Sequence, residues 1–401
     1  MSKIYDIVCF SSQEFRRKDD LWTNKQHIMK RLAATNRVLF VNPLSCFSVR
    51  RCIRLKKPFP VLERDPENLW IFWSHRITSR RFARNWKIHK WFNTALLRRC
   101  IRKLHMRKNL VLWFYDPEME YMPGKLGERL VVYDCVDIMS AFPRYGDPVL
   151  RAEFIEKEER LVRRSDLVFA TTDAIYREKK VLNESTYLVP NVGDFEHFSA
   201  ALSPDLKPAG EIARMKRPVI GFIGAVTDYK LDIPLLEAVA QMRPDWSLVL
   251  AGPVLKPCDR FGSSSLSERE NVHVLGKVPY EKLPAYVKGF DVCIIPYALN
   301  DYTRGVFPIK FFEYMATGKP VVSTPLPSLL GYSPLVSFGK SPTEFIGAVE
   351  EALREEDESI VRKRIETARE NTWPGRIRRI MGLIEQHWPN KQSASNQQGF
   401  G

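Results

Sequence analysis

The 401-residue sequence lacks two features that would place it in or across a membrane, a long apolar run and a signal peptide. A helix needs about eighteen consecutive apolar residues to cross a bilayer, and no such run is present. The N-terminus, MSKIYDIVCFSS, has a short apolar run that is typical of a first strand, without the long apolar region or cleavage site of a signal peptide. We therefore expect a cytoplasmic protein that does not span the membrane.

Motifs for disulfides, zinc and common nucleotide sites are also missing. The seven cysteines are scattered and odd in number, with no C-x-x-C pair, which argues against a disulfide framework and a zinc site. G-x-G-x-x-G and G-x-x-x-x-G-K-[ST] are absent, so neither a standard dinucleotide enzyme nor a P-loop NTPase is supported. No helix-turn-helix, zinc-finger or RNP pattern appears, and we expect no nucleic acid partner.

The sequence does contain two successive series of alternating strands and helices, and its length suits two domains. The first half predicts buried parallel strands at 6–10, 37–41, 110–114, 130–133 and 167–170. The second half predicts strands at 219–223, 247–251, 272–275, 291–296 and 321–324, with helices at 233–242 and 280–288. This alternation is typical of a doubly wound α/β fold. The polar stretch 199–218 reads as a linker, which puts a domain boundary near residue 205.

The stretch PIKFFEYMATGKPVV, from Pro308 to Val322, predicts a nucleotide-diphosphate site. Pro308 suits the first position of a helix and Gly318 suits its end. Lys310 and Glu313 would then share a face, where the lysine and the free N–H groups of the helix start attract phosphate. The glutamate can accept two hydrogen bonds from ribose hydroxyls. Such sheets bind ligands beyond the carboxyl ends of their strands, which is where Lys310 falls.

This stretch resembles the donor-site signature P-x-K-x-x-E-Y-x-A-x-G-K-P-V-V of GT-B glycosyltransferases, most closely the bacterial exopolysaccharide and teichuronic-acid enzymes of the family 1 and 4 type. The resemblance covers residues 218–324 and implies two Rossmann-like α/β domains that face an interdomain cleft. It implies that Lys310 contacts the donor phosphates and that Glu313 holds the ribose. Many retaining relatives carry a second glutamate where this chain has Gly305, which leaves the stereochemical course open.

The resemblance also implies further donor contacts and a division of the chain. Donor-binding positions would include Gly224, Lys277, Pro296 and Tyr297. Residues 1–204 would bind the acceptor and 205–371 the nucleotide sugar, a helix at 372–390 would pack back on the first domain, and 391–401 has the composition of a disordered tail. The D-x-D pair with which the other main glycosyltransferase fold holds a divalent cation is absent, so we expect no metal and no cofactor beyond the donor.

Candidate residues for the chemistry lie in the first half. The sequence VVYDCVDIMSAF puts Asp134 and Asp137 at the carboxyl end of a buried strand. Related enzymes with Y-D-x-x-D here have a candidate base at the second aspartate, so Asp137 is predicted as the base and Asp134 as its orienting neighbour. Alternatively, Asp137 only caps the next helix. Predicted acceptor contacts are Asp19, Trp22 and His27, although a lone histidine at a helix start is more often structural.

A basic segment lies between these motifs. Residues 76–108 contain twelve Lys or Arg and no Asp or Glu, in a chain whose net charge is +15. On helical spacing, part of this segment forms a basic surface with tryptophans at its centre, and the surface consists of Trp86, Lys87, Lys90, Trp91, Thr94, Ala95 and Arg98. Such a surface suits an anionic membrane interface, and the alternative is a solvated helix whose aromatic residues enter the core.

These features together predict a glycosyltransferase at the inner face of the membrane. It would move a sugar from a nucleotide diphosphate donor, a UDP-sugar by preference, to a lipid-linked or polysaccharide acceptor in cell-surface polysaccharide synthesis. One alternative is a non-hydrolysing nucleotide-sugar epimerase, which shares the fold and the ribose-binding glutamate. Another is a non-catalytic subunit of polysaccharide assembly that binds nucleotide or lipid.

Overall fold

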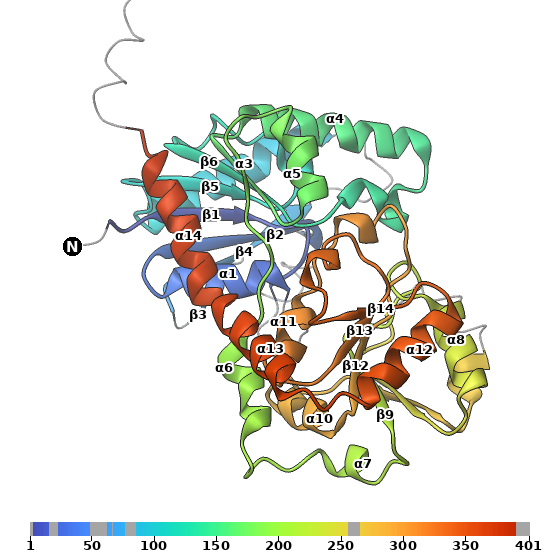
Figure 1. The fold of residues 1–401 in the computed structure, drawn as a ribbon. Coiled ribbons are helices and arrows are strands. Elements are labelled where there is room, and N and C mark those ends of the chain that lie inside the picture. The colour runs from blue at the N-terminus through green and yellow to red at the C-terminus, as the bar shows by residue number, and fades with distance from the viewer. Residues whose placement is uncertain are drawn as a thin grey trace, which may run out of the picture.

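Two β-sheets organise the part of the chain that this computed structural model describes, residues 3–15, 23–48, 62–65, 67–76, 86–255 and 265–389 (Figure 1). Within those residues the first sheet has the strand order β3-β4-β2-β1-β5-β6-β7-β8. The second has the order β11-β10-β9-β12-β13-β14. Neighbouring strands pair in parallel except for β3, which is antiparallel to β4 at one edge. The predicted α/β fold with parallel sheets is confirmed.

The first sheet is buried on both faces, which explains why its central strands are continuous apolar runs. In β1, Ile7 and Cys9 belong to one core and Val8 and Phe10 to the other, because successive side chains point to opposite faces. The strands are β1 (Asp6–Phe10), β2 (Arg37–Ser48), β3 (Leu62–Asp65), β4 (Leu69–Arg76), β5 (Leu110–Phe114), β6 (Leu130–Cys135), β7 (Leu167–Ala170) and β8 (Thr186–Leu188).

Helices cover both faces of this sheet (Figure 1). One core contains residues of α1 (Asn24–Ala33) and of α14 (Trp373–Gln386), which comes from the far end of the chain. The opposite core contains residues of α3 (Trp86–Lys103), α4 (Pro148–Arg164) and α5 (Asp173–Lys180). Short 3-10 turns join these elements at η2 (Pro117–Met119), η3 (Met139–Ala141) and η4 (Pro143–Tyr145).

The second sheet has a single continuous core of its own. Its strands are β9 (Val219–Ile223), β10 (Ser247–Ala251), β11 (Val272–Gly276), β12 (Val292–Ile295), β13 (Val321–Ser323) and β14 (Ser337–Phe338). Its helices are α8 (Ile233–Met242), α10 (Leu283–Gly289), α11 (Ile309–Met315), α12 (Pro342–Leu353) and α13 (Glu358–Glu370). The connecting pieces are α6 (Phe195–Phe198), η5 (Ser199–Leu202), α7 (Gly210–Ala213), η6 (Ser265–Glu268), η7 (Tyr280–Lys282), η8 (Thr303–Gly305) and η9 (Leu330–Tyr332).

The segment after β8 joins the two halves of the molecule. Asn191 donates a hydrogen bond from its side-chain amide to the carbonyl of Phe307, two residues before α11, at 2.9 Å. Its side-chain oxygen accepts one from Arg376 of α14 at 2.7 Å. Gly193 pairs with Thr372 in an isolated bridge. A Cβ on Gly193 would lie 2.9 Å from the backbone nitrogen of Glu313, so glycine permits this close packing against α11.

Two expectations about the organisation of the chain stay predictions. The first is the domain boundary at residue 204. The second is the disordered tail at 391–401, which lies outside the described residues. None of the described helices is long and apolar enough to cross a membrane.

Candidate functional site

Lys310 lies where the second sheet meets the start of α11. Its ammonium group donates a hydrogen bond to the hydroxyl of Tyr297, which follows β12, at 2.6 Å. It lies 5.0 Å from the centre of the Phe222 ring of β9. Gly224 follows β9 with a φ of 142°, and a Cβ there would lie 3.0 Å from the lysine Nζ. Glycine is therefore needed at this position, and three of the predicted donor residues, Gly224, Tyr297 and Lys310, lie together.

Glu313 lies one helical turn after Lys310 and is 9% exposed. Burial raises the pKa of Glu313, the positive charge of Lys310 lowers it, and the nearby charge of Asp194 raises it. Burial likewise lowers the pKa of Lys310, and the charge of Glu313 raises it. Each group therefore offsets part of the other's desolvation. The spacing in the sequence correctly predicted that the two side chains lie close together.

The helix itself is shorter than the sequence indicated. Pro308 is the residue before the first turn rather than in it, and α11 ends at Met315, three residues before Gly318. Gly318 has a φ of 73° and lies beyond the helix end. With only seven residues, α11 has a small dipole. The prediction that this helix start binds a diphosphate therefore rests on the charge of Lys310 more than on the helix, and it stays a prediction.

The other two predicted donor residues lie along the same edge of the second sheet. Pro296 is buried directly after β12, and its carbonyl accepts a hydrogen bond from the backbone of Asp232 at 2.9 Å. Lys277 is exposed after β11, the edge strand, and follows Gly276, whose φ is 66°. Their donor-binding roles stay predictions.

Asp137 lies where the first sheet meets the second half of the molecule. It follows β6, it is half-buried, and its carboxylate accepts a hydrogen bond from the Tyr302 hydroxyl at 3.4 Å. The next residue, Ile138, packs onto Gly305 so closely that a Cβ on this glycine would overlap the isoleucine side chain. The position where many retaining relatives carry a glutamate therefore has no room for a side chain in this arrangement.

Asp134 is buried near helix α14. It is 1% exposed, and its nearest positive charge is the Arg376 guanidinium of α14 at 3.9 Å. Burial raises the pKa of Asp134, while the charge of Arg376 lowers it. The structure thus puts the Asp134 carboxylate against α14 rather than against Asp137, and its predicted orienting role stays a prediction. Breaking such a buried pair from one side typically costs about 3–5 kcal/mol.

His27 has a packed position between α1 and α14. Its ring stacks on Trp373 with the centroids 4.7 Å apart, and its Nδ1 lies 2.9 Å from the Arg31 guanidinium. It is 3% exposed, and burial together with the charge of Arg31 lowers the pKa of His27 to about 3. This environment suits a neutral structural histidine, and the predicted acceptor contact stays a prediction. Asp19 and Trp22 lie outside the described residues.

Comparisons with known proteins decide the family. Residues 217–355 match the family model described as "Glycosyl transferases group 1", and this range includes Gly224, Lys277, Pro296, Tyr297, Lys310 and Glu313. The chain is also 32% identical over 285 residues to TuaH of Bacillus subtilis, which is described as a teichuronic acid biosynthesis glycosyltransferase. That match covers 67% of this chain and 70% of TuaH. The chain is a group 1 glycosyltransferase.

Solved structures place this glycosyltransferase in the GT-B fold. Anabaena HepE, solved in complex with UDP and glucose, matches with a TM-score of 0.65 at 14% identity, over 95% of this chain and 99% of HepE. Sucrose-phosphate synthase from Thermosynechococcus elongatus matches with a TM-score of 0.69 at 14% identity, over 95% of this chain and 98% of that one. At these identities the similarity shows the fold alone, and the predicted GT-B architecture is confirmed.

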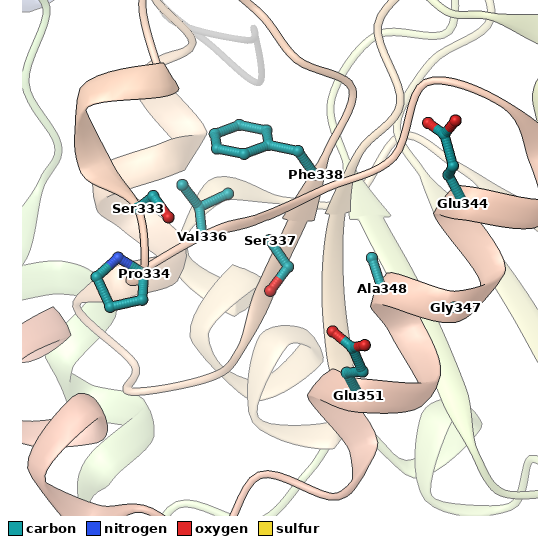
Figure 2. A pocket seen from close by; sticks show the side chains of 9 residues that line it. All are labelled: Ser333, Pro334, Val336, Ser337, Phe338, Glu344, Gly347, Ala348 and Glu351. Atoms are coloured by element: carbon teal, nitrogen blue, oxygen red, sulfur yellow. The ribbon is translucent and has the colours of Figure 1, made fainter.

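A hollow on the second half of the glycosyltransferase does not suit a diphosphate. Figure 2 shows it between the segment leading into β14 and helix α12, and it is lined by Ser333, Pro334, Val336, Ser337, Phe338, Glu344, Gly347, Ala348 and Glu351. Its charged side chains are the carboxylates of Glu344 and Glu351, which repel anions. None of the predicted donor residues lines it.

Among the described residues no group of three or more His, Cys, Asp or Glu could hold a metal ion, and the expectation of a metal-free reaction is untested.

Three residues that the sequence analysis did not predict lie close to predicted site residues. Asn191 is not among the predicted site residues, yet its side-chain amide links α14 to the residue before Pro308. Tyr302 donates to Asp137, and nothing in its local sequence indicates this long-range contact. Lys25 is 5% exposed beside the end of β1, and a buried lysine has no signature in the sequence.

Proposed function

We propose that this enzyme transfers a sugar from a UDP-sugar to a lipid-linked or saccharide acceptor in cell-surface polysaccharide synthesis. The observation that carries the proposal is the meeting of Lys310, Tyr297 and Gly224 on the second sheet, with Asp137 of the first sheet in contact with the same half of the molecule. The description of TuaH as a teichuronic acid biosynthesis glycosyltransferase supports a polysaccharide product. The UDP bound in HepE supports the choice of nucleotide.

The proposed roles follow from charge and position. Lys310 would bind the donor diphosphate and offset the negative charge that develops on it as it leaves. Glu313 would accept hydrogen bonds from the ribose hydroxyls. Asp137 would take the proton of the acceptor hydroxyl as that oxygen bonds to the anomeric carbon. The bond from the anomeric carbon to the diphosphate breaks, and its electron pair leaves with UDP.

Nucleotide binding tests the donor half of this proposal. We expect UDP to bind the purified protein at micromolar level, about 8 kcal/mol of binding free energy, when followed by titration calorimetry. GDP and ADP carry the same diphosphate on other bases and should bind at least about tenfold more weakly if a pocket selects the base. Tighter binding of GDP or ADP would change the proposed donor, and the absence of binding by all three would remove it.

We also propose that α3 holds the enzyme on an anionic membrane. Its exposed stripe has Ile88 (52% exposed) and Trp91 (72% exposed) at its centre. Basic side chains flank them on the same side of the helix, and these are Lys87, Arg98, Arg99 and Arg102. Thr94, which the sequence placed on this surface, is instead buried, because Leu97, Cys100 and Ile101 turn that side of the helix toward the core. A cationic stripe with exposed apolar side chains suits the interface of an anionic bilayer.

Replacing Trp91 with alanine should weaken membrane binding by about tenfold, because burying a large apolar side chain contributes about 1.5–3 kcal/mol and an interface buries only part of it. Sedimentation with vesicles of phosphatidylglycerol and phosphatidylcholine measures this. Val181→Ala is the matched control, since Val181 is an apolar side chain that is 85% exposed after α5. Equal binding by wild type and the Trp91 variant, or no preference for anionic vesicles, would contradict the proposal.

A further inference from the structure

The first turn of α1 carries a buried lysine that the proposed donor site does not use. α1 follows Thr23, which forms a capping box with Gln26, and Lys25 lies between these two residues in the sequence. Only 5% of Lys25 is exposed. Its Nζ lies 3.3 Å from the Ser12 hydroxyl and 5.8 Å from the centre of the Tyr115 ring. Ser12 follows β1 and Tyr115 follows β5, so the ammonium group lies at the carboxyl edge of the first sheet.

This position is unfavourable for a lysine in two respects. Burial takes the ammonium group out of water and lowers the pKa of Lys25. The N-terminus of a helix is the positive end of its dipole and repels a cation. Within the described residues, Ser12 is the one hydrogen-bond partner of an ammonium group that has three donors. A contribution to fold stability therefore does not account for Lys25.

Two carboxylates that follow neighbouring strands act on Lys25 through their charge. Against the effect of burial, the charges of Asp137 and Asp116 raise the pKa of Lys25, while that of Arg144 lowers it. The two aspartates follow β6 and β5, which are adjacent in the sheet. Asp116 already accepts a hydrogen bond from the Glu118 backbone at 3.1 Å, whereas the Asp137 carboxylate accepts only the longer one from Tyr302 at 3.4 Å in the described residues. Asp137 therefore depends more on a nearby positive charge.

We propose that Lys25 is a positioning residue for the transfer reaction, whose ammonium group keeps the Asp137 carboxylate ionised at the edge of the first sheet. This inference rests on the proposed role of Asp137 as the base. Asp137 must be unprotonated to take the proton of the acceptor hydroxyl, and burial favours its protonated form. Lys25 keeps its own proton throughout the step, so the protons balance with Asp137 as the sole acceptor.

Other charged and titratable groups near Lys25 and Asp137 also affect the protonation of these two residues. From the second half of the molecule, Lys230 stabilises the Asp137 carboxylate by its charge and Tyr302 by its hydrogen bond, and the Tyr229 and Tyr297 hydroxyls lie within its electrostatic range. Around Lys25, besides Asp116 and Arg144, lie Cys9 of β1 and the buried Asp134. Lys25 on α1 and Asp137 after β6 both belong to the first half of the molecule, so this cation does not depend on the contact between the two halves.

The test is a direct titration of the Asp137 carboxyl carbon in protein labelled with carbon-13 aspartate, where the Asp137 signal is the one lost in Asp137→Asn. We expect Lys25→Met to raise the midpoint by at least about one pH unit, since a nearby opposite charge shifts a carboxyl by about 1–3 units. Lys25→Gln should do the same if the methionine variant does not fold. Lys25→Arg should restore the wild-type midpoint, and Lys30→Met, later on the same helix, should leave it unchanged.

The outcomes separate this inference from the proposed function. An unchanged Asp137 midpoint in both neutral Lys25 variants, with UDP binding intact, would overturn the inference and leave the donor site standing. The expected rise in the midpoint, together with full transfer activity in Asp137→Asn, would support the electrostatic pairing and overturn the role of Asp137 as base. A rise of the same size in Lys30→Met would show a general effect of charge on α1 and would also overturn the specific role of Lys25.

Discussion

Replacing Lys310 with alanine is expected to weaken UDP binding by about 10- to 150-fold, the equivalent of about 1.5–3 kcal/mol for a lost charge-assisted hydrogen bond. The reason is the position of its ammonium group, which is 2.6 Å from the Tyr297 hydroxyl and against the backbone of Gly224 at the end of β9. Lys230 also lies near this place, with its ammonium group 5.3 Å from the centre of the Tyr297 ring, so the variant removes one of two nearby cations. Calorimetric titration of UDP into wild type and variant measures the effect.

Glu313→Ala should weaken the binding of UDP by a similar factor. It should weaken the binding of deoxyuridine diphosphate less, because that nucleotide lacks a ribose hydroxyl for the glutamate to bind. The matched control is Glu351→Ala in the hollow between β14 and α12 (Figure 2). If UDP occupied that hollow, the control would change affinity and Lys310→Ala would not. That result would move the donor site to the hollow between β14 and α12.

The pH dependence of UDP binding gives a second test of Lys310, because the affinity should fall as the pH rises. Burial holds the pKa of Lys310 below the usual range of a lysine. The diphosphate binds the protonated form, so affinity is full below this pKa and falls as the pH rises through it. The fall should therefore begin at a lower pH than an ordinary lysine would give, and it should be absent in Lys310→Ala. A pH-independent affinity in wild type would argue against a buried lysine as the phosphate ligand.

The sequence predicted the central strands well because each is buried on both faces. β1, β5, β7, β9 and β10 have the predicted bounds, and all their residues are buried. The strands it missed include β4, which has eight residues and lies between β3 and β2, and three others that are short or lie at sheet edges. β8 has three residues and β14 has two, and β3 is an antiparallel edge strand with no fully buried residue. Such strands have little or no apolar pattern by which a sequence could reveal them.

The candidate site was predictable only where it is local in the sequence. Lys310 and Glu313 are three residues apart on one helix, so their proximity followed from helical spacing. Contacts between distant elements were not predictable in this way. The stacking of His27 on Trp373, the pairing of Asp134 with Arg376 and the filling of the space at Gly305 by Ile138 each depend on how the halves pack. The burial of Lys25 also depends on the packing of elements that are distant in the sequence.

Asp137→Asn is expected to lower the rate of sugar transfer by about 10²–10⁴-fold, the usual contribution of a general base, while UDP affinity changes by less than about twofold. The amide keeps the shape of the side chain and its hydrogen bond from Tyr302 but cannot take a proton. UDP release from the donor sugar nucleotide in the presence of acceptor-bearing membranes measures the rate. Tyr302→Phe is the companion variant, and it should cost less than about tenfold because the carboxylate remains.

The alternative role for Asp137, a simple helix cap, makes the opposite prediction. The turn that follows it, η3, has Ile138 at its N-cap and no side-chain capping bond. Asn is as good a cap as Asp, so a capping role would leave transfer unchanged in Asp137→Asn. A base also gives a pH profile that a cap does not. Burial raises the pKa of Asp137, so wild-type transfer should rise as the pH increases through that raised pKa, and the residual activity of Asp137→Asn should lack this rise.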